Sequence, residues 1–132
     1  MEKSEMEVVI HTPQDCGNSP RKAILLELTK ACLNKDTLFI SKHITEDIKV
    51  NLIGHGKIQG KENLLAFIYQ NNTYNITEVT IETIITHGTA AALNGYTLIR
   101  NKGGSAFSLI YTFTDSTKNV MIKEITSYFT KV

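Results

Sequence analysis

Hydrophobic and polar positions alternate along the last third of the chain. Alternation with a period of two, rich in β-branched side chains, is typical of a half-buried strand. In residues 76–86 it assigns one set of side chains to a single face, namely Val79, Ile81, Thr83 and Ile85. Similar segments at residues 90–99, 105–114 and 120–130 are separated by short polar or glycine-containing turns. The pattern predicts four consecutive antiparallel strands.

The third of these strands has the strongest apolar face. It aligns four large side chains on one side, Phe107, Leu109, Tyr111 and Phe113. An antiparallel sheet with one apolar face needs other elements to cover that face. Each large side chain buried there contributes on the order of 1.5–3 kcal/mol. We therefore expect helices to pack against this row.

Helical spacing appears upstream of the strands. A helix is predicted from Ser19, a good N-cap, and Pro20, which suits the first helical position. Its apolar stripe consists of Ile24, Leu25, Leu28, Ala31 and Cys32. Asp36 is expected to cap a second short helix that reaches His43 and packs on the sheet through Phe39 and Ile40. This region predicts the cover for the sheet.

A strand is predicted at residues 47–53, a short continuation at Ile58, and a third helix after Gly60-Lys61-Glu62. Residues 71–75 form a predicted loop that leads to the four strands. Residues 1–18 form a predicted N-terminal arm, in which residues 8–10 can pair as a short edge strand. Residues 19–132 form one predicted domain. The expected fold class is α+β.

Composition narrows the class of protein. The chain has 132 residues, 42% of them hydrophobic and 20% charged, and a net charge of +1. These values fit one globular domain. The basic residues are scattered, and no apolar run approaches the roughly 20 residues needed to span a bilayer. We expect no nucleic-acid or membrane partner, no signal peptide, reduced Cys16 and Cys32, and a cytoplasmic location.

Several short segments together resemble one known superfamily. They are His11-Thr12-Pro13, Asp15-Cys16-Gly17-Asn18, Gly60-Lys61-Glu62, residues 85–88, residues 91–95 and residues 125–128. With the order of elements, they make the chain similar to small bacterial members of the nuclear transport factor 2-like, or SnoaL-like, superfamily. The resemblance implies a cystatin-like cone, in which N-terminal helices pack in a strongly curved antiparallel sheet around a pocket. It also implies a homodimer through the sheet.

Catalytic members of that superfamily, such as ketosteroid isomerase, use two acidic groups in the cone. One carboxylate moves a proton, and a second acid, kept neutral by an apolar site, donates a hydrogen bond to the oxyanion. The resemblance aligns Asn51 with the first acid and Leu109 with the second. Asparagine cannot accept the proton at neutral pH and leucine cannot donate one. The isomerase mechanism is therefore not carried over.

Two other residues are candidate bases. His55 lies between two glycines where the first predicted strand ends, and its alternative interpretation is an exposed turn histidine. Glu124 would be the only acid in the pocket, although its parity is opposite to that of apolar Ile125. The four histidines have no metal-binding spacing. We expect no metal and no cofactor.

The residues expected to line the cone come from several elements: Phe39, Asn51, Ile53, Asn94, Tyr96, Leu109, Tyr111 and Ser127. The alternative for Asn94 and Tyr96 is a face that points to solvent or to a second subunit. Three hypotheses follow. The first is a domain that binds a small, largely apolar molecule. The second is an isomerase, cyclase or dehydratase that uses His55 or Glu124. The third is a dimeric interaction module without a ligand.

Overall fold

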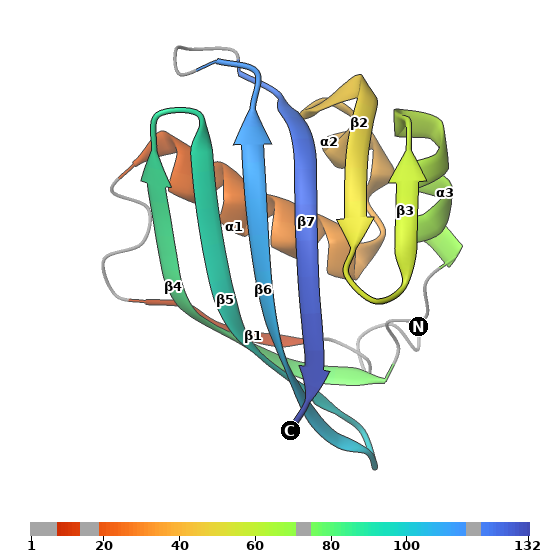
Figure 1. Ribbon diagram of the computed structural model, residues 1–132. Coiled ribbons are helices and arrows are strands. Elements are labelled where there is room, and N and C mark those ends of the chain that lie inside the picture. The colour runs from red at the N-terminus through yellow and green to blue at the C-terminus, as the bar shows by residue number, and fades with distance from the viewer. Residues whose placement is uncertain (1–7, 14–18, 71–74, 116–119) are drawn as a thin grey trace.

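The computed structural model describes residues 8–13, 19–70, 75–115 and 120–132 (Figure 1). Cys16, most of the predicted arm and most of residues 71–75 lie outside the described residues, as do residues 116–119 of the last turn. The helices are α1 (Pro20–Asn34), α2 (Thr37–Ser41) and α3 (Lys61–Gln70). The strands are β1 (Val9–His11), β2 (Ile44–Leu52), β3 (Gly56–Gln59), β4 (Ile76–His87), β5 (Ala90–Ile99), β6 (Gly103–Phe113) and β7 (Ile122–Lys131).

All of these strands belong to one sheet, in the order β1-β4-β5-β6-β7-β2-β3. The predicted four-stranded meander is confirmed as β4 to β7, which pair antiparallel in succession. The sheet as a whole is mixed rather than wholly antiparallel, because β1 pairs parallel with β4 and β2 pairs parallel with β7. Parallel neighbours need a long connection. Here the helices and the meander supply it.

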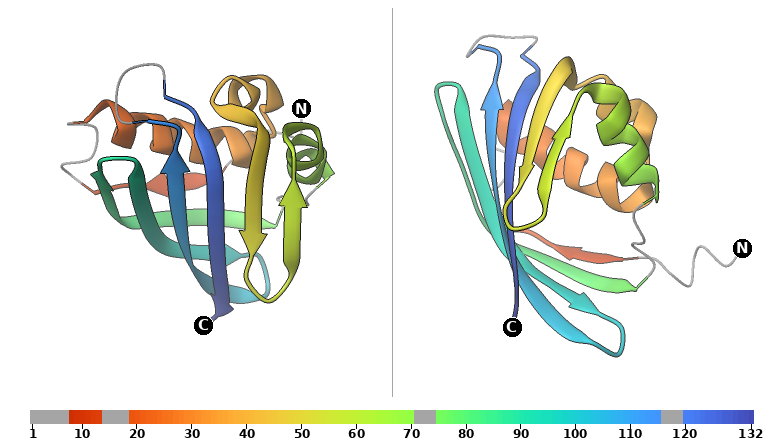
Figure 2. Two further views of the ribbon diagram at one scale, coloured as in Figure 1. Left: turned by 45° about the horizontal axis from the view of Figure 1, so that its top comes forward. Right: turned by 45° about the vertical axis from the view of Figure 1, so that its right-hand side comes forward.

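The described helices all lie on one side of the curved sheet, and none of them covers the other side (Figure 2). We call the helix-covered side the concave face and the other side the outer face. Strands β4 and β5 approach closely at Gly95, where a Cβ atom would lie 1.9 Å from the Thr80 carbonyl oxygen. The same region of β4 has a register shift between Ile81 and Thr83. Bulges and glycines are common where a sheet bends sharply.

The bulge in β4 corrects one prediction. Strict alternation assigned Ile85 to the same face as Val79 and Ile81. The structure instead buries Ile84, which is 5% exposed, and leaves Ile85 59% exposed. A bulge places one extra residue on a strand, so the alternation inverts beyond it.

The predicted helix stripe and strand row meet in the core. Leu25, Leu28 and Ala31 of α1 are buried, and so are Phe107, Tyr111 and Phe113 of β6. Leu109, the fourth member of the β6 row, is only half-buried. The covered row predicted from the sequence is therefore confirmed, with its least covered position at Leu109.

The observed ends of α1 and α2 agree with the predicted ends only in part. Asp36 caps α2, since its carboxylate accepts a hydrogen bond from the Phe39 backbone N–H at 3.1 Å, but α2 ends at Ser41 rather than His43. Ser19 occupies the N-cap of α1 without a side-chain cap bond. At the other end of α1, the Lys35 ammonium donates to the carbonyls of Ile68 and Tyr69 in the last turn of α3. A cation there stabilises the helix C-terminus and fastens α3 to α1.

Candidate ligand-binding face

Strand register defines the residues of the concave face. One cross-strand row runs through Leu52, Ser127, Leu109 and Leu93, and the next through Val50, Ile125, Tyr111 and Ala91. A third row contains Phe129, Phe107 and Gly95. Cross-strand partners point to the same side of a sheet. These three rows therefore consist only of uncharged side chains.

Tyr111 lies deep in this face and is 5% exposed. Burial raises the pKa of its phenol, and the neighbouring Cys32 thiol of α1 raises it further. Burial also raises the pKa of Cys32 to about 11. A charged form is unfavourable where little water is present to solvate it. Both groups are therefore neutral at physiological pH, and the Tyr111 hydroxyl keeps its proton as a hydrogen-bond donor.

Two buried hydroxyls of the concave face have no hydrogen-bond partner in the part of the chain that the structure describes. They belong to Tyr111 and Ser127, and Ser127 is 6% exposed. Thr45 Oγ1 is the only described side-chain oxygen or nitrogen that is both unpartnered and sealed from solvent. The hydroxyls of Tyr111 and Ser127 thus retain some accessible surface. Thr97 differs, since its Oγ1 lies 2.8 Å from Ser105 Oγ.

Apolar side chains of the concave face are incompletely covered around these hydroxyls. Leu52 and Leu109 are half-buried. Phe129, near the end of β7, is 57% exposed, and its ring stacks on Phe107 with a centroid distance of 6.0 Å. The helices therefore leave part of the apolar concave face accessible.

Asn51 and Glu124 lie on the outer face. The Asn51 side-chain amide donates to Glu124 Oε2 at 3.2 Å and to Thr126 Oγ1 at 3.5 Å. Register explains this placement, because Asn51 pairs with Thr126 while its neighbour Val50 pairs with concave Ile125. The two residues lie together, but on the opposite side of the sheet from Tyr111. The parity of Glu124 relative to Ile125 was the sequence signal for this result.

Asn94 and Tyr96 also lie on the outer face. They alternate with Leu93 and Gly95, which are buried on the concave face. Tyr96 is 45% exposed. Of the two orientations considered for this pair, the structure has the one directed to solvent or to a second subunit.

His55 lies in the tight turn between β2 and β3 and is exposed. Gly54 and Gly56 on either side have φ angles of +84° and +117°, and the His55 N–H donates to the Leu52 carbonyl at 2.7 Å. These features fit the turn interpretation of His55.

Ile53, which is 48% exposed, precedes this turn. An open hollow of about 290 Å³ at the hairpin is lined by Asn51, Leu52, Ile53, Gly54, Gly56, Lys57 and Thr126.

Phe39 of α2 is half-buried. Its ring lies 4.5 Å from the His43 ring, and its carbonyl oxygen is 3.0 Å from His43 Nδ1. It therefore packs against the core at the α2 end.

Sequence reasoning assigned Cys32 to the core but did not place it beside Tyr111. It also left Leu52 and Phe129 out of the concave face. A helical stripe shows which residues turn inward, but not which strand residue each will meet. The signal for Phe129 was its parity with Ser127 in the last strand.

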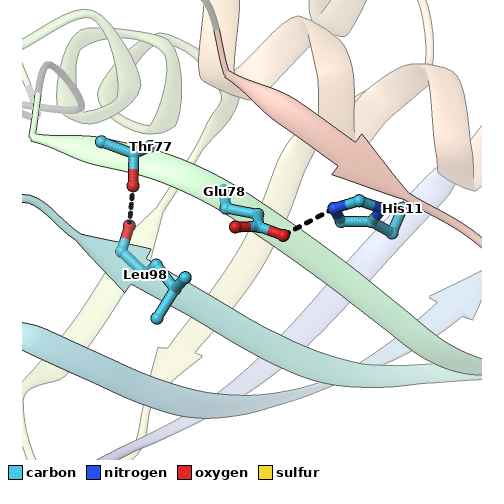
Figure 3. Close-up of polar contacts among 4 residues, drawn as sticks. All are labelled: His11, Thr77, Glu78 and Leu98. Carbon is cyan, nitrogen blue, oxygen red and sulfur yellow. Dashed lines mark hydrogen bonds and ion pairs between the residues drawn. The ribbon is translucent and has the colours of Figure 1, made fainter.

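The outer face carries large apolar residues between 43% and 59% exposed: Ile85, Tyr96, Leu98, Ile110 and Tyr128. Charged groups flank them at the two edges of the sheet. On the β1–β4 edge, His11 Nε2 lies 2.6 Å from Glu78 Oε2, and the Thr77 hydroxyl donates to the Leu98 carbonyl nearby (Figure 3). Lys49 and Lys57 occupy β2 and β3 at the other edge.

Within the described ranges, no three His, Cys, Asp or Glu side chains come close enough to share a metal ion. Among the helices described, none has the length and apolar content needed to cross a membrane.

No protein-family model matches this chain, and no curated protein matches its sequence. Solved structures do match its fold. An NTF2-like protein of unknown function from Cytophaga hutchinsonii ATCC 33406 is 17% identical, with 85% of this chain and 90% of that chain covered and a TM-score of 0.66. An uncharacterised protein with a cystatin-like fold from Silicibacter pomeroyi DSS-3 is 13% identical, with 86% and 76% covered and a TM-score of 0.67.

A third similar structure, from Kribbella flavida DSM 17836, is provisionally named a ketosteroid isomerase. It is 12% identical, with 83% of this chain and 77% of that chain covered and a TM-score of 0.64. Identities this low establish the fold alone. The chain therefore has the nuclear transport factor 2-like, cystatin-like α+β fold, as predicted.

Proposed function

We propose that this protein binds a small, uncharged and largely apolar molecule on its concave face. The observation that carries the proposal is the incompletely covered apolar surface formed by Leu52, Leu109 and Phe129. Ligand sites are concave and mostly apolar, with a few polar groups that orient the ligand. Burying the accessible part of these side chains against a ligand would contribute about 25 cal/mol for each Å² removed from water.

Three observations favour binding over isomerase chemistry. Leu109, which the resemblance aligns with the oxyanion acid, offers no hydrogen-bond donor. Asn51, which the resemblance aligns with the base, is directed to the outer face and hydrogen-bonds Glu124 there. His55 is exposed in a turn. A general base must come within hydrogen-bond reach of the proton that it removes.

Replacing Phe129 with serine is expected to weaken binding of the neutral dye Nile red by about fivefold. The substitution removes an aromatic surface from the accessible end of the concave face. Because Phe129 is 57% exposed, its loss leaves the packed core intact. Fluorescence titration of wild type and variant measures the change.

The matched control is Tyr128→Ser. Tyr128 is the preceding residue, is 44% exposed and points to the outer face. This variant should bind the dye as wild type does. Equal loss in both variants, or no binding by wild type, would contradict the concave-face site.

A second function is supported by a different surface. We propose that two copies associate through their outer faces, because Ile85, Ile110, Tyr96 and Tyr128 expose neighbouring apolar surface there. A two-fold axis parallel to the strands would set the β1–β4 edge of one copy opposite the β2–β3 edge of the other.

Replacing Ile110 with aspartate is expected to weaken self-association by at least about thirtyfold, which corresponds to roughly 2 kcal/mol at an interface centre. The new carboxylate would be buried without a partner in the dimer. Analytical ultracentrifugation over a range of protein concentrations measures the dissociation constant.

Leu38→Asp provides the comparison for this experiment. Leu38 is 71% exposed on α2, so the same kind of charge is introduced away from the sheet. This variant should associate as wild type does. A wild-type protein that stays monomeric at millimolar concentration would rule out the dimer.

A further inference from the structure

Tyr111 and Ser127 combine two properties that rarely occur together. Each residue is more than nine-tenths buried, and the hydroxyl of each has no hydrogen-bond partner in the described chain. Buried polar groups in folded proteins are nearly always hydrogen-bonded. Both hydroxyls keep some accessible surface, since neither is sealed as Thr45 Oγ1 is. A partner can therefore reach them from the concave side.

The two residues are close neighbours on one face. Ser127 pairs with Leu109 across β6 and β7, and Tyr111 is two residues from Leu109 in the same strand. A diagonal pair of this kind is separated by about 7–8 Å, which lies within reach of a tyrosine side chain. Half-buried Leu109 and Leu52 belong to the same row as Ser127. The free hydroxyls thus lie beside the accessible apolar surface.

We propose that Tyr111 and Ser127 bind the polar group of the ligand, and that this group is a hydroxyl or carbonyl of an uncharged molecule with a hydrocarbon body. This inference rests on the proposed binding function and specifies its ligand class. Tyr111 donates its hydroxyl proton to the ligand oxygen. Ser127 donates to a carbonyl, or accepts from a hydroxyl.

The electrostatics of the site select against a charged ligand. The only buried polar residues that the structure describes are Thr97 and Ser127, neither of which can carry a charge to offset one on the ligand. Moving an ionised carboxylate into such a place without a cation is costly. Cys32 also stays protonated beside Tyr111, because burial raises the pKa of its thiol. A long-chain alcohol or ketone therefore fits better than the corresponding fatty acid.

Four probes with eight carbon atoms test this inference: octan-1-ol, octan-2-one, octanoate and octane. Each competes with Nile red in a fluorescence displacement assay. Octan-1-ol and octan-2-one should bind wild type about fivefold or more tightly than octane, and octanoate should bind least. Tyr111→Phe removes one oxygen from a filled core. This variant should lose most of the extra affinity that wild type has for octan-1-ol and octan-2-one over octane. Its affinity for octane should stay unchanged.

Ser127→Ala provides a second variant, and it should also lower the affinity for octan-1-ol and octan-2-one relative to octane. Tyr128→Phe is the matched control, since it deletes a tyrosine hydroxyl from the outer face. If none of the probes binds, the proposed function itself fails. Another outcome is that the probes bind while Tyr111→Phe and Ser127→Ala both leave the ratio of octan-1-ol affinity to octane affinity unchanged. In that case this inference fails and the binding function stands. Tightest binding by octanoate would overturn the uncharged ligand class.

Discussion

Replacement of Gly95 with alanine is expected to lower the free energy of unfolding by about 3 kcal/mol or more. A Cβ atom there would lie 1.9 Å from the Thr80 carbonyl oxygen and 2.9 Å from the Thr80 carbonyl carbon. Both are backbone atoms of the neighbouring strand, so no side-chain rotation relieves the contact. Strands β4 and β5 would have to separate where the sheet bends. Thermal unfolding should show a midpoint lowered by about 10 °C.

Gly54→Asn separates this clash from the general cost of replacing a glycine. Nothing lies within 4 Å of a Cβ atom at Gly54, and its φ angle of +84° is near the region that asparagine tolerates. We expect a change within about 1 kcal/mol for this variant. A Gly95→Ala protein that melts within about 2 °C of wild type would show that the two strands are not this close in solution.

Stability is expected to fall steeply as the pH rises from about 9 to about 11. Burial raises the pKa of the Cys32 thiol to about 11 in the folded chain, and burial together with Cys32 raises that of the Tyr111 phenol. The unfolded chain loses these protons first, so the folded state binds more protons over this range. Each group can then remove up to about 1.4 kcal/mol of stability per pH unit. Below about pH 8 neither group changes the stability.

Urea unfolding at several pH values, with Tyr111→Phe and Cys32→Ala beside wild type, measures this dependence. Above about pH 9 Cys32→Ala should show a shallower decline than wild type, and above about pH 10, where an exposed phenol loses its proton, so should Tyr111→Phe. Tyr69→Phe is the control, because Tyr69 is 66% exposed and its phenol meets water in both states. Identical slopes in all four proteins would mean that Tyr111 and Cys32 are not buried together.

Much of the fold followed from local patterns. The strand at residues 90–99 was predicted with the observed bounds, and the β6 row from Phe107 to Phe113 faces the helices as expected. Alternation predicts such rows because each side chain of a strand points to one of two faces. The prediction for Ile85 was wrong because the bulge between Ile81 and Thr83 arises from pairing with β5. No local pattern marks that pairing.

The candidate site was predicted less well than the fold. Leu109, Tyr111 and Ser127 lie on the concave face, whereas Asn51, Asn94, Tyr96 and Glu124 lie on the outer face. The polar residues were considered for the pocket because of their chemistry. Their strand parity was the more informative signal, because they alternate along the strands with Val50, Leu93, Gly95 and Ile125 of the concave face.

The sequence alone determined which segments are helices or strands, and which side chains of β6 face the helices, because periodicity and turn residues act over a few neighbouring positions. The tertiary structure decided which faces meet. It brought Cys32 of α1 beside Tyr111 of β6, left the Tyr111 and Ser127 hydroxyls without partners in the described chain, and set Asn51 against Glu124 on the other side. These contacts join residues far apart in the chain, where local preferences carry no information about distance.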